Sequence, residues 1–139
     1  MPVKKARTSI IDAIYPGFTA HSDRGKASNA RGKVYERAVA NRLKPLFKKA
    51  ARTYGQSREG HELPDVGGTP FWIECANGST NAIHAKLRQG LVATSKSSSE
   101  EYGGAPVAVF SHHAKAGLHM VTMEAGQFVD LLRKLYGKR

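Results

Sequence analysis

The chain has 139 residues, a length typical of one compact domain that can bury a core without cross-links. Its single cysteine, Cys75, excludes an internal disulfide and a zinc site built from several cysteines, and it fits a reducing, cytoplasmic setting. No segment approaches the roughly 18 consecutive apolar residues of a membrane span, and the first residues lack the apolar run of a secretory signal. We therefore expect no membrane contact.

The formal charge of +11 is distributed unevenly along the chain. Residues 1–58 hold 14 Lys and Arg against 3 Asp and Glu, whereas residues 59–139 hold 8 of each. Polyanions select such a positive region, because each neutralised phosphate releases condensed counterions. The distribution predicts a nucleic-acid partner; the alternative is a solvated basic face without a specific ligand.

Residues 1–30 are basic and rich in small residues, and we expect them to form an N-terminal arm ahead of one domain, residues 31–139. At the start of that domain, apolar residues recur at spacings of three and four, which indicates an amphipathic helix. They are Tyr35, Val39, Leu43, Leu46, Phe47 and Ala50. Pro45 must kink or divide this helix, because it cannot donate to the carbonyl four residues earlier.

The remaining elements are predicted from short apolar runs and from helical spacing. Strands are expected at 53–57, 63–66, 71–76, 106–110 and 118–123, with Gly67 and Gly68 as a turn, and helices at 81–95 and 125–136. The run Phe71–Ile73 suggests a strand covered on both faces. The order helix, three strands, helix, two strands, helix predicts an α/β sandwich around a central mixed sheet.

Two carboxylates fall on one predicted hairpin. Asp65 follows Pro64 at its start, and Glu74 lies nine residues later on the returning strand. Two carboxylates that face one another repel unless a proton or a cation lies between them, and Mg²⁺ prefers oxygen ligands of this kind. Glu36 on the first helix could supply a third oxygen or hold a metal-bound water. Taken singly, each acid also has an ordinary structural explanation, as a turn residue, a solvated strand position or a helix-start charge.

The runs GKVYERAV (32–39), PDV (64–66) and FWIECAN (71–77), followed by a helix that carries LRQ (87–89), together resemble the PD-(D/E)xK nuclease superfamily. They are most similar to the small Holliday-junction resolvases of archaea and phages. The resemblance covers residues 30–135 and implies a restriction-endonuclease-like core, with a central mixed sheet flanked by helices. It also implies a Mg²⁺-dependent, structure-selective DNA endonuclease (with Mn²⁺ as the alternative ion) that acts in DNA recombination and repair. Such an enzyme would be a homodimer on four-way junctions, in the host cytoplasm if phage-encoded.

The resemblance also assigns roles to residues. Metal ligands are implied at Glu36, Asp65 and Glu74, with the Cys75 backbone carbonyl, and a helix glutamine near the metal at Gln89. Ser57 or Arg58 would lie at the phosphate. The DNA backbone would be held by Arg31, Lys33 and Arg37, with the arm.

The chain departs from the family motif at Ala76, where the family has a lysine that positions or activates the attacking water. Three explanations remain open: an engineered replacement, migration of the role to Lys86 or Lys33, and a natural inactive binder. Under the first, Ala76→Lys should restore cleavage; under the second, Lys86→Ala should abolish it. The rival functions are a non-catalytic nucleic-acid-binding module of the same fold and a phage restriction or repair nuclease.

For the remaining chemically reactive side chains, the sequence predicts structural roles rather than functional ones. His112, His113 and His119 surround one predicted turn and are expected to be exposed rather than to bind metal. Cys75 alternates with Glu74 along its strand, so it should face away from the metal and pack in the core. Trp72 is at least as suited to the core as to base stacking.

Overall fold

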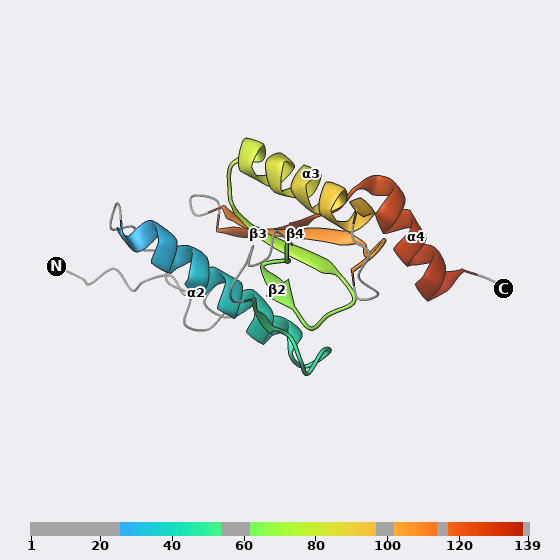
Figure 1. The fold of residues 1–139 in the computed structure, drawn as a ribbon, viewed down its shortest axis with the longest axis horizontal. Helices are drawn as coiled ribbons and strands as arrows, with labels where there is room; N and C mark the ends of the chain where they lie inside the picture. Colours follow the sequence, from blue (N-terminus) through green and yellow to red (C-terminus); the bar gives the residue numbers. More distant parts are fainter. Residues whose placement is uncertain (1–25, 54–61, 97–101, 114–116, 138–139) are drawn as a thin grey trace.

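The structure, a computed structural model, describes residues 26–53, 62–96, 102–113 and 117–137 (Figure 1). Its elements in chain order are α2 (Lys26–Leu43), β1 (Ala51–Arg52), β2 (Val66–Gly67), β3 (Trp72–Asn77), α3 (Thr80–Lys96), β4 (Val107–His113), β5 (Leu118–Thr122) and α4 (Ala125–Tyr136). This order confirms the predicted mixed α/β class and the succession of helices and strands within the described part of the chain.

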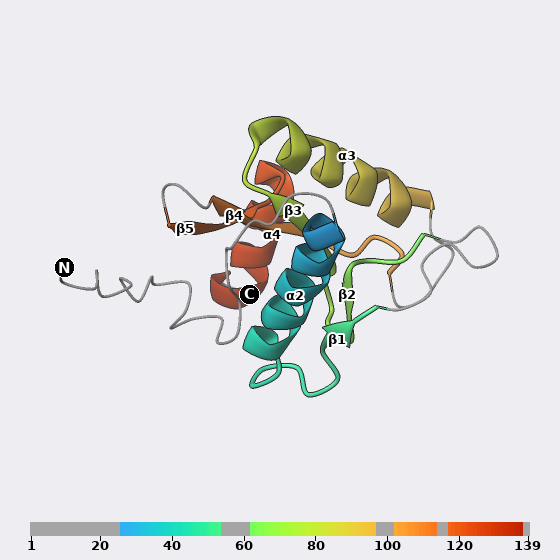
Figure 2. The same ribbon diagram turned by 90° about the vertical axis from the view of Figure 1, so that its left-hand side faces the viewer.

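The five strands form one mixed sheet in the order β1-β2-β3-β4-β5. Only β3 and β4 are parallel, and α3 makes the crossover between them; the other three neighbouring pairs are antiparallel. Helix α3 contacts β3 and β4, whereas α2 contacts β1, β2 and β3. Figures 1 and 2 show the two helices on opposite sides of the sheet, so β3 lies at the centre of a three-layer arrangement.

Each face of the sheet has its own apolar cluster. On the α2 face, Tyr35, Val39, Val66 and Ile73 are buried, and Cys75 packs against them. On the α3 face the cluster consists of Trp72, Ala76, Ile83, Tyr102, Val107 and Val109. Consecutive residues of β3 therefore point to opposite faces, and the prediction that this strand is covered on both sides is confirmed. Cys75 points to the face opposite Glu74, as predicted.

Several boundaries differ from the predictions. Helix α2 begins at Lys26, inside the expected arm, and ends at Leu43, so Pro45 terminates the helix instead of kinking it. The strand predicted at 53–57 is found at Ala51–Arg52, and residues 54–57 lie outside the described residues. Strand β2 has two residues and includes Gly67, which was predicted as turn; the turn conformation falls on Gly68, whose φ is 78°.

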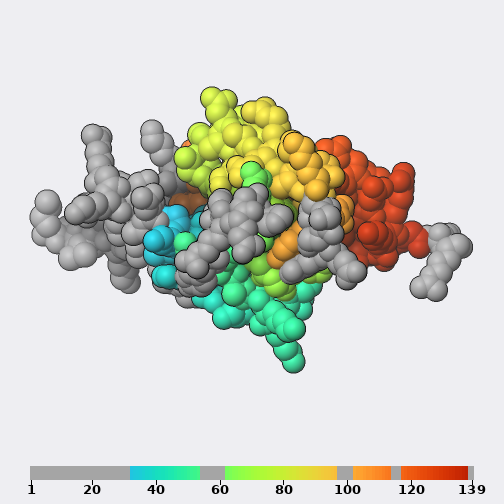
Figure 3. All heavy atoms as spheres, viewed as in Figure 1, coloured from blue at the N-terminus to red at the C-terminus, as the bar shows by residue number. Residues whose placement is uncertain are grey.

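Helix α4 lies at one end of the molecule, beyond the C-terminal half of α3 (Figure 3). Its stripe of apolar residues is exposed, including Phe128, Leu132 and Leu135, and none of its residues is buried. The side chain of Gln127 ties it to the sheet by accepting a hydrogen bond from the backbone N–H of Val107 at 2.9 Å. Among the described helices, none combines the length and the apolar composition that crossing a membrane would require.

Candidate active site

Asp65 is fixed against β3 by its backbone and by its side chain. Its N–H donates to the Ile73 carbonyl at 2.8 Å, and its Oδ2 accepts a hydrogen bond from the Cys75 N–H at 2.9 Å. The carboxylate therefore serves as the acceptor that a backbone carbonyl would provide in a regular ladder, and Pro64, which has no N–H, cannot donate to β3. The N–H and carbonyl of one strand residue point to the same side, which puts the Cys75 carbonyl on the side of Asp65.

Glu74 lies in the middle of β3 and is only 1% exposed. Its Oε1 accepts a hydrogen bond from the indole Nε1 of Trp72 at 2.8 Å. Burial, followed by the negative charge of Asp65, raises the pKa of Glu74 to about 7, although Lys86 and the indole N–H act in the opposite direction. Near neutral pH this carboxyl group therefore changes its charge readily.

Lys86 of α3 reaches down to both carboxylates. Its Nζ lies 3.2 Å from Glu74 Oε2 and 3.5 Å from Asp65 Oδ2. Burial alone would lower the pKa of Lys86, but the two carboxylates outweigh that effect and raise it above its ordinary value. The side chain is 34% exposed, so the ammonium lies at the border between the core and the solvent. The strand and the helix thus form a cluster of two acids and one lysine.

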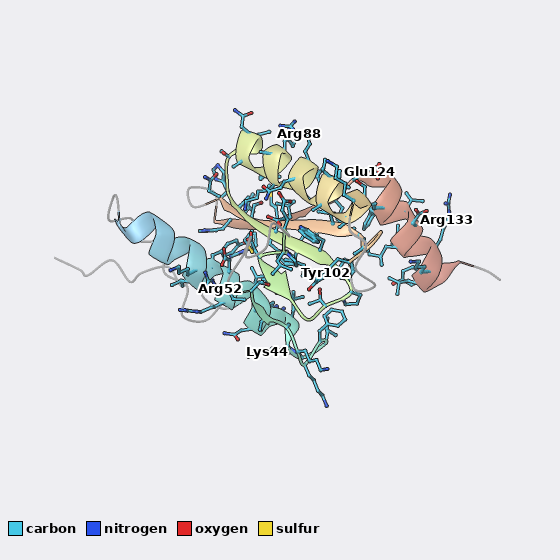
Figure 4. All side chains as sticks on the ribbon, in the orientation of Figure 1. Lys44, Arg52, Arg88, Tyr102, Glu124 and Arg133 are labelled. Atoms are coloured by element: carbon cyan, nitrogen blue, oxygen red, sulfur yellow. The ribbon has the colours of Figure 1, made fainter. Side chains whose placement is uncertain are left out.

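Glu36 approaches the same cluster from α2, where Arg52 of β1 engages it. The Arg52 Nε donates to Glu36 Oε2 at 2.6 Å, with side-chain exposures of 15% and 19%. Burial raises the pKa of Glu36, the hydrogen bond from Arg52 partly opposes this, and the charge of Asp65 raises it further. Figure 4 labels Arg52 together with Arg88, which projects from the outer side of α3.

Only some of the predicted metal ligands lie where they could bind the same divalent ion. Within the described residues, no three His, Cys, Asp or Glu side chains lie close enough to hold a metal, so Glu36, Asp65 and Glu74 do not form the expected trio. The pair Asp65 and Glu74, with the Cys75 carbonyl, offers three hard oxygens of the type that Mg²⁺ binds alongside water and phosphate. A cation, the Lys86 ammonium, already lies between these carboxylates, which indicates that the position attracts positive charge.

The other predicted residues lie at varying distances from this cluster. Ala76 is buried in the apolar cluster on the α3 face, and Gln89 is exposed on α3. Lys33 and Arg37 are exposed on α2. Arg31 belongs to α2, but its side chain lies outside the described residues, as do Ser57 and Arg58.

Arg52 and Trp72 were not predicted as site residues. Nothing in the sequence around Arg52 links it to Glu36, which is 16 residues away. Trp72 did carry a signal, since residues two apart in a strand share a face and Trp72 precedes Glu74 by two.

The prediction of exposed histidines is wrong for His112 and His119. Their rings stack with centroids 5.0 Å apart, and Tyr35 of α2 stacks on His119 at 5.8 Å. Burial lowers the pKa of His112, and burial with the neighbouring His112 lowers the pKa of His119 to about 4. These two rings are therefore neutral packing elements between α2 and the sheet, while His113 is exposed.

Comparison with protein-family models, with curated proteins and with solved structures finds no match to this chain. The function proposed below therefore depends on the geometry of the cluster itself.

Proposed function

We propose that this protein is a Mg²⁺-dependent endonuclease that hydrolyses phosphodiesters in branched DNA, with a restriction-endonuclease-like core. One observation supports this most strongly. The Lys86 ammonium lies within 3.5 Å of both Asp65 and Glu74, which restores the two acids and one lysine of the nuclease motif that Ala76 interrupts. Burying the charges of Asp65, Glu74 and Lys86 costs free energy of folding, and such clusters of perturbed ionisable groups are typical of active sites.

Each residue of the cluster would have a distinct task. Asp65, Glu74 and the Cys75 carbonyl would hold Mg²⁺, which supplies Lewis-acid polarisation of the phosphoryl oxygen and lowers the pKa of bound water. Lys86 would orient the attacking water and offset the negative charge that develops on the phosphate. Water would add to phosphorus as the P–O bond to the leaving strand breaks, with one proton lost from the water to solvent and one taken up from solvent by the leaving oxygen.

The position of Ala76 favours migration of the lysine over an engineered loss. Ala76 is 7% exposed and packs with Ile83 of α3 in the apolar cluster. A lysine there would have to displace apolar contacts, whereas Lys86 reaches the carboxylates one helical turn further along α3. Lys33 is exposed on α2 and makes no ion pair within the described residues.

Part of the DNA backbone would contact the basic side chains that are exposed on α2, Lys33, Arg37 and Arg42. Their charge continues the basic excess of residues 1–58. Paired nicks across a four-way junction require two sites related by a two-fold axis, so the proposal includes a homodimer. A cytoplasmic location would supply both the substrate and a reducing environment for Cys75.

Cleavage assays on a four-way junction, a flap and a linear duplex would test this. With Mg²⁺ or Mn²⁺ the chain should cut the junction, and Lys86→Ala should reduce the rate by about 10²-fold or more, the loss typical of a charge-stabilising group. Lys96→Ala, at the exposed end of the same helix, is the matched control and should change little. Ala76→Lys should give no gain in rate. Equal cutting of linear duplex would contradict junction selectivity.

A non-catalytic DNA-binding module of the same fold is the second candidate, favoured by two observations. Glu36 is engaged by Arg52, and three-ligand metal groups are absent among the described residues. Under this alternative, the chain and its Ala76→Lys variant would both bind junctions and cut none of the three substrates.

A further inference from the structure

Trp72 lies directly behind the carboxylate of Glu74. Its Nε1 donates to Glu74 Oε1 at 2.8 Å, and both residues are 1% exposed. The two side chains share a face of β3 because they are two residues apart. One oxygen of Glu74 is thus engaged by a neutral donor inside the core.

The second oxygen of Glu74 points to a different partner. Oε2 lies 3.2 Å from the Nζ of Lys86, the same ammonium that contacts Asp65. A divalent ion held by the two carboxylates beside this ammonium would therefore meet Oε2, while Oε1 stays with the indole.

Neighbouring residues hold the indole ring in this position. Tyr102 packs against it edge to face, with ring centroids 5.4 Å apart. On the α3 side, a Cβ at Gly90 would lie 3.1 Å from Cδ1 and 3.3 Å from Nε1 of the indole, and 2.6 Å from Val107 Cγ1. Helix α3 can approach the strands this closely because residue 90 has no side chain. The ring consequently has little room to turn away from Glu74.

The two common divalent ions differ in what they require of a carboxylate. Mg²⁺ takes single oxygens in a near-ideal octahedron, whereas the larger Ca²⁺ readily accepts both oxygens of one carboxylate. We propose that Trp72 is a positioning residue that restricts Glu74 to one-oxygen coordination, and so favours Mg²⁺ and Mn²⁺ over Ca²⁺ at the site of Asp65 and Glu74. This inference rests on the proposed function, because it requires a metal at that site.

Calorimetric titration of the full chain with Mg²⁺ and with Ca²⁺ would test the inference. Trp72→Phe keeps an aromatic ring but has no N–H, so Glu74 Oε1 becomes available to Ca²⁺. The ratio of the two Kd values should shift toward Ca²⁺ by about tenfold, the change typical of one hydrogen bond to a charged group. Tyr102→Phe, which leaves the indole hydrogen bond in place, should leave the ratio unchanged. An unchanged ratio in Trp72→Phe would overturn the inference.

A second measurement uses the wild-type chain and does not depend on the folding of a variant. The chain has one tryptophan, so ¹⁵N labelling gives one indole N–H resonance. Its hydrogen exchange should stay slow when Mg²⁺ binds, because the bond to Oε1 is retained. Faster exchange with Mg²⁺ would overturn the role of Trp72. Failure of the wild-type chain to bind either ion would overturn the proposed metal site as well, whereas binding with an unchanged ratio would overturn only the inference about Trp72.

Discussion

Strands β3 and β4 lie side by side and run parallel, and their central residues are buried, but only β3 carries a buried carboxylate. Glu74 of β3 is in register with Val109 of β4, and their exposures are 1% and 0%. Val109 belongs to the apolar cluster on the α3 face, and so do Trp72 and Ala76, which flank Glu74 on that face of β3. The sheet therefore accommodates a valine where it also accommodates a carboxylate, so packing alone does not require Glu74.

The difference lies in the partners that each position offers. Glu74 has the indole N–H of Trp72 and the ammonium of Lys86 within 3.2 Å. Val109 instead belongs to the apolar cluster that includes Val107 and Ile83. A buried ion pair is weak evidence of stabilisation, since desolvation can exceed the attraction between the charges. Strand β3 therefore carries a buried carboxylate, Glu74, that the fold tolerates but does not need for packing.

The largest effect on activity is expected when Glu74 of β3 is replaced by valine, the residue at the paired position of β4. Under the proposed function, Glu74→Val should reduce junction cleavage by about 10³-fold or more, because the proposed metal ligand and the partner of Lys86 are lost together. The cleavage rate at saturating Mg²⁺ measures this. Glu62→Val, which removes an exposed acid ahead of the same hairpin, is the control and should retain the rate. A Glu74→Val protein that cuts at nearly the wild-type rate would refute the catalytic role of the β3 carboxylate.

The reverse exchange places a carboxylate in β4, where Glu74 already occupies the hydrogen bonds from Trp72 and Lys86. Val109→Glu should lower the free energy of unfolding by about 3–5 kcal/mol, the penalty for a buried charge without compensation. Urea unfolding measures it. Val92→Glu on α3, where the side chain is 51% exposed, should change stability by less than about 0.5 kcal/mol. If Val109→Glu were as stable as the wild type, the partners of Glu74 would not be what makes its burial tolerable.

The pH dependence of stability gives a third comparison. Burial raises the pKa of Glu74 from 4.5 to about 7 in the folded protein, so the folded state holds more protons than the unfolded chain between these pH values. The free energy of unfolding of the metal-free protein should therefore fall as the pH rises through this window, by about 3 kcal/mol in total. Glu74→Gln has no such group, so its stability relative to the wild type should increase from pH 5 to pH 8. A constant difference across that range would show that the carboxyl group titrates normally.

The smallest effect is expected on the opposite face of β3. Cys75 contributes its backbone N–H to Asp65, and its side chain packs on the α2 face. Burial raises the pKa of the thiol well above its usual range, so it stays protonated. Cys75→Ala should change the cleavage rate by less than about twofold and the stability by about 1 kcal/mol. A large loss of cleavage would mean that the thiol itself takes part.

Long periodic segments were predicted well from the sequence. Helix α4 was expected at 125–136 and is found there, and α3 was expected at 81–95 and spans Thr80–Lys96. Their apolar spacing extends over three turns or more, so local pattern and tertiary contacts agree. The two-residue strands β1 and β2 are too short to show a period, and their positions depend on pairing, of β2 with β3 and of β1 with β2.

The site was predictable where its residues belong to one hairpin or to the next helix. Asp65, Glu74 and Lys86 were named from the sequence, and the structure brings these three together. The engagement of Glu36 by Arg52 depends on how α2 lies against β1, which is a tertiary fact without a sequence pattern. The half-buried packing of His112 and His119 was missed for the same reason, because Tyr35 contacts them from another layer.

The close approach of α3 at Gly90 has a consequence for recognising relatives of this chain. A Cβ at residue 90 would lie 2.6 Å from Val107 Cγ1 and 3.1 Å from Trp72 Cδ1, so relatives that keep both side chains are expected to keep a glycine 18 positions after the tryptophan, even though glycine disfavours a helix by about 1 kcal/mol. Together with the acid and the lysine, this gives the pattern W-x-E-x₁₁-K-x₃-G. Such linked positions should vary together in genomes where the rest of the sequence has diverged beyond recognition, and they offer a search term that does not depend on overall similarity.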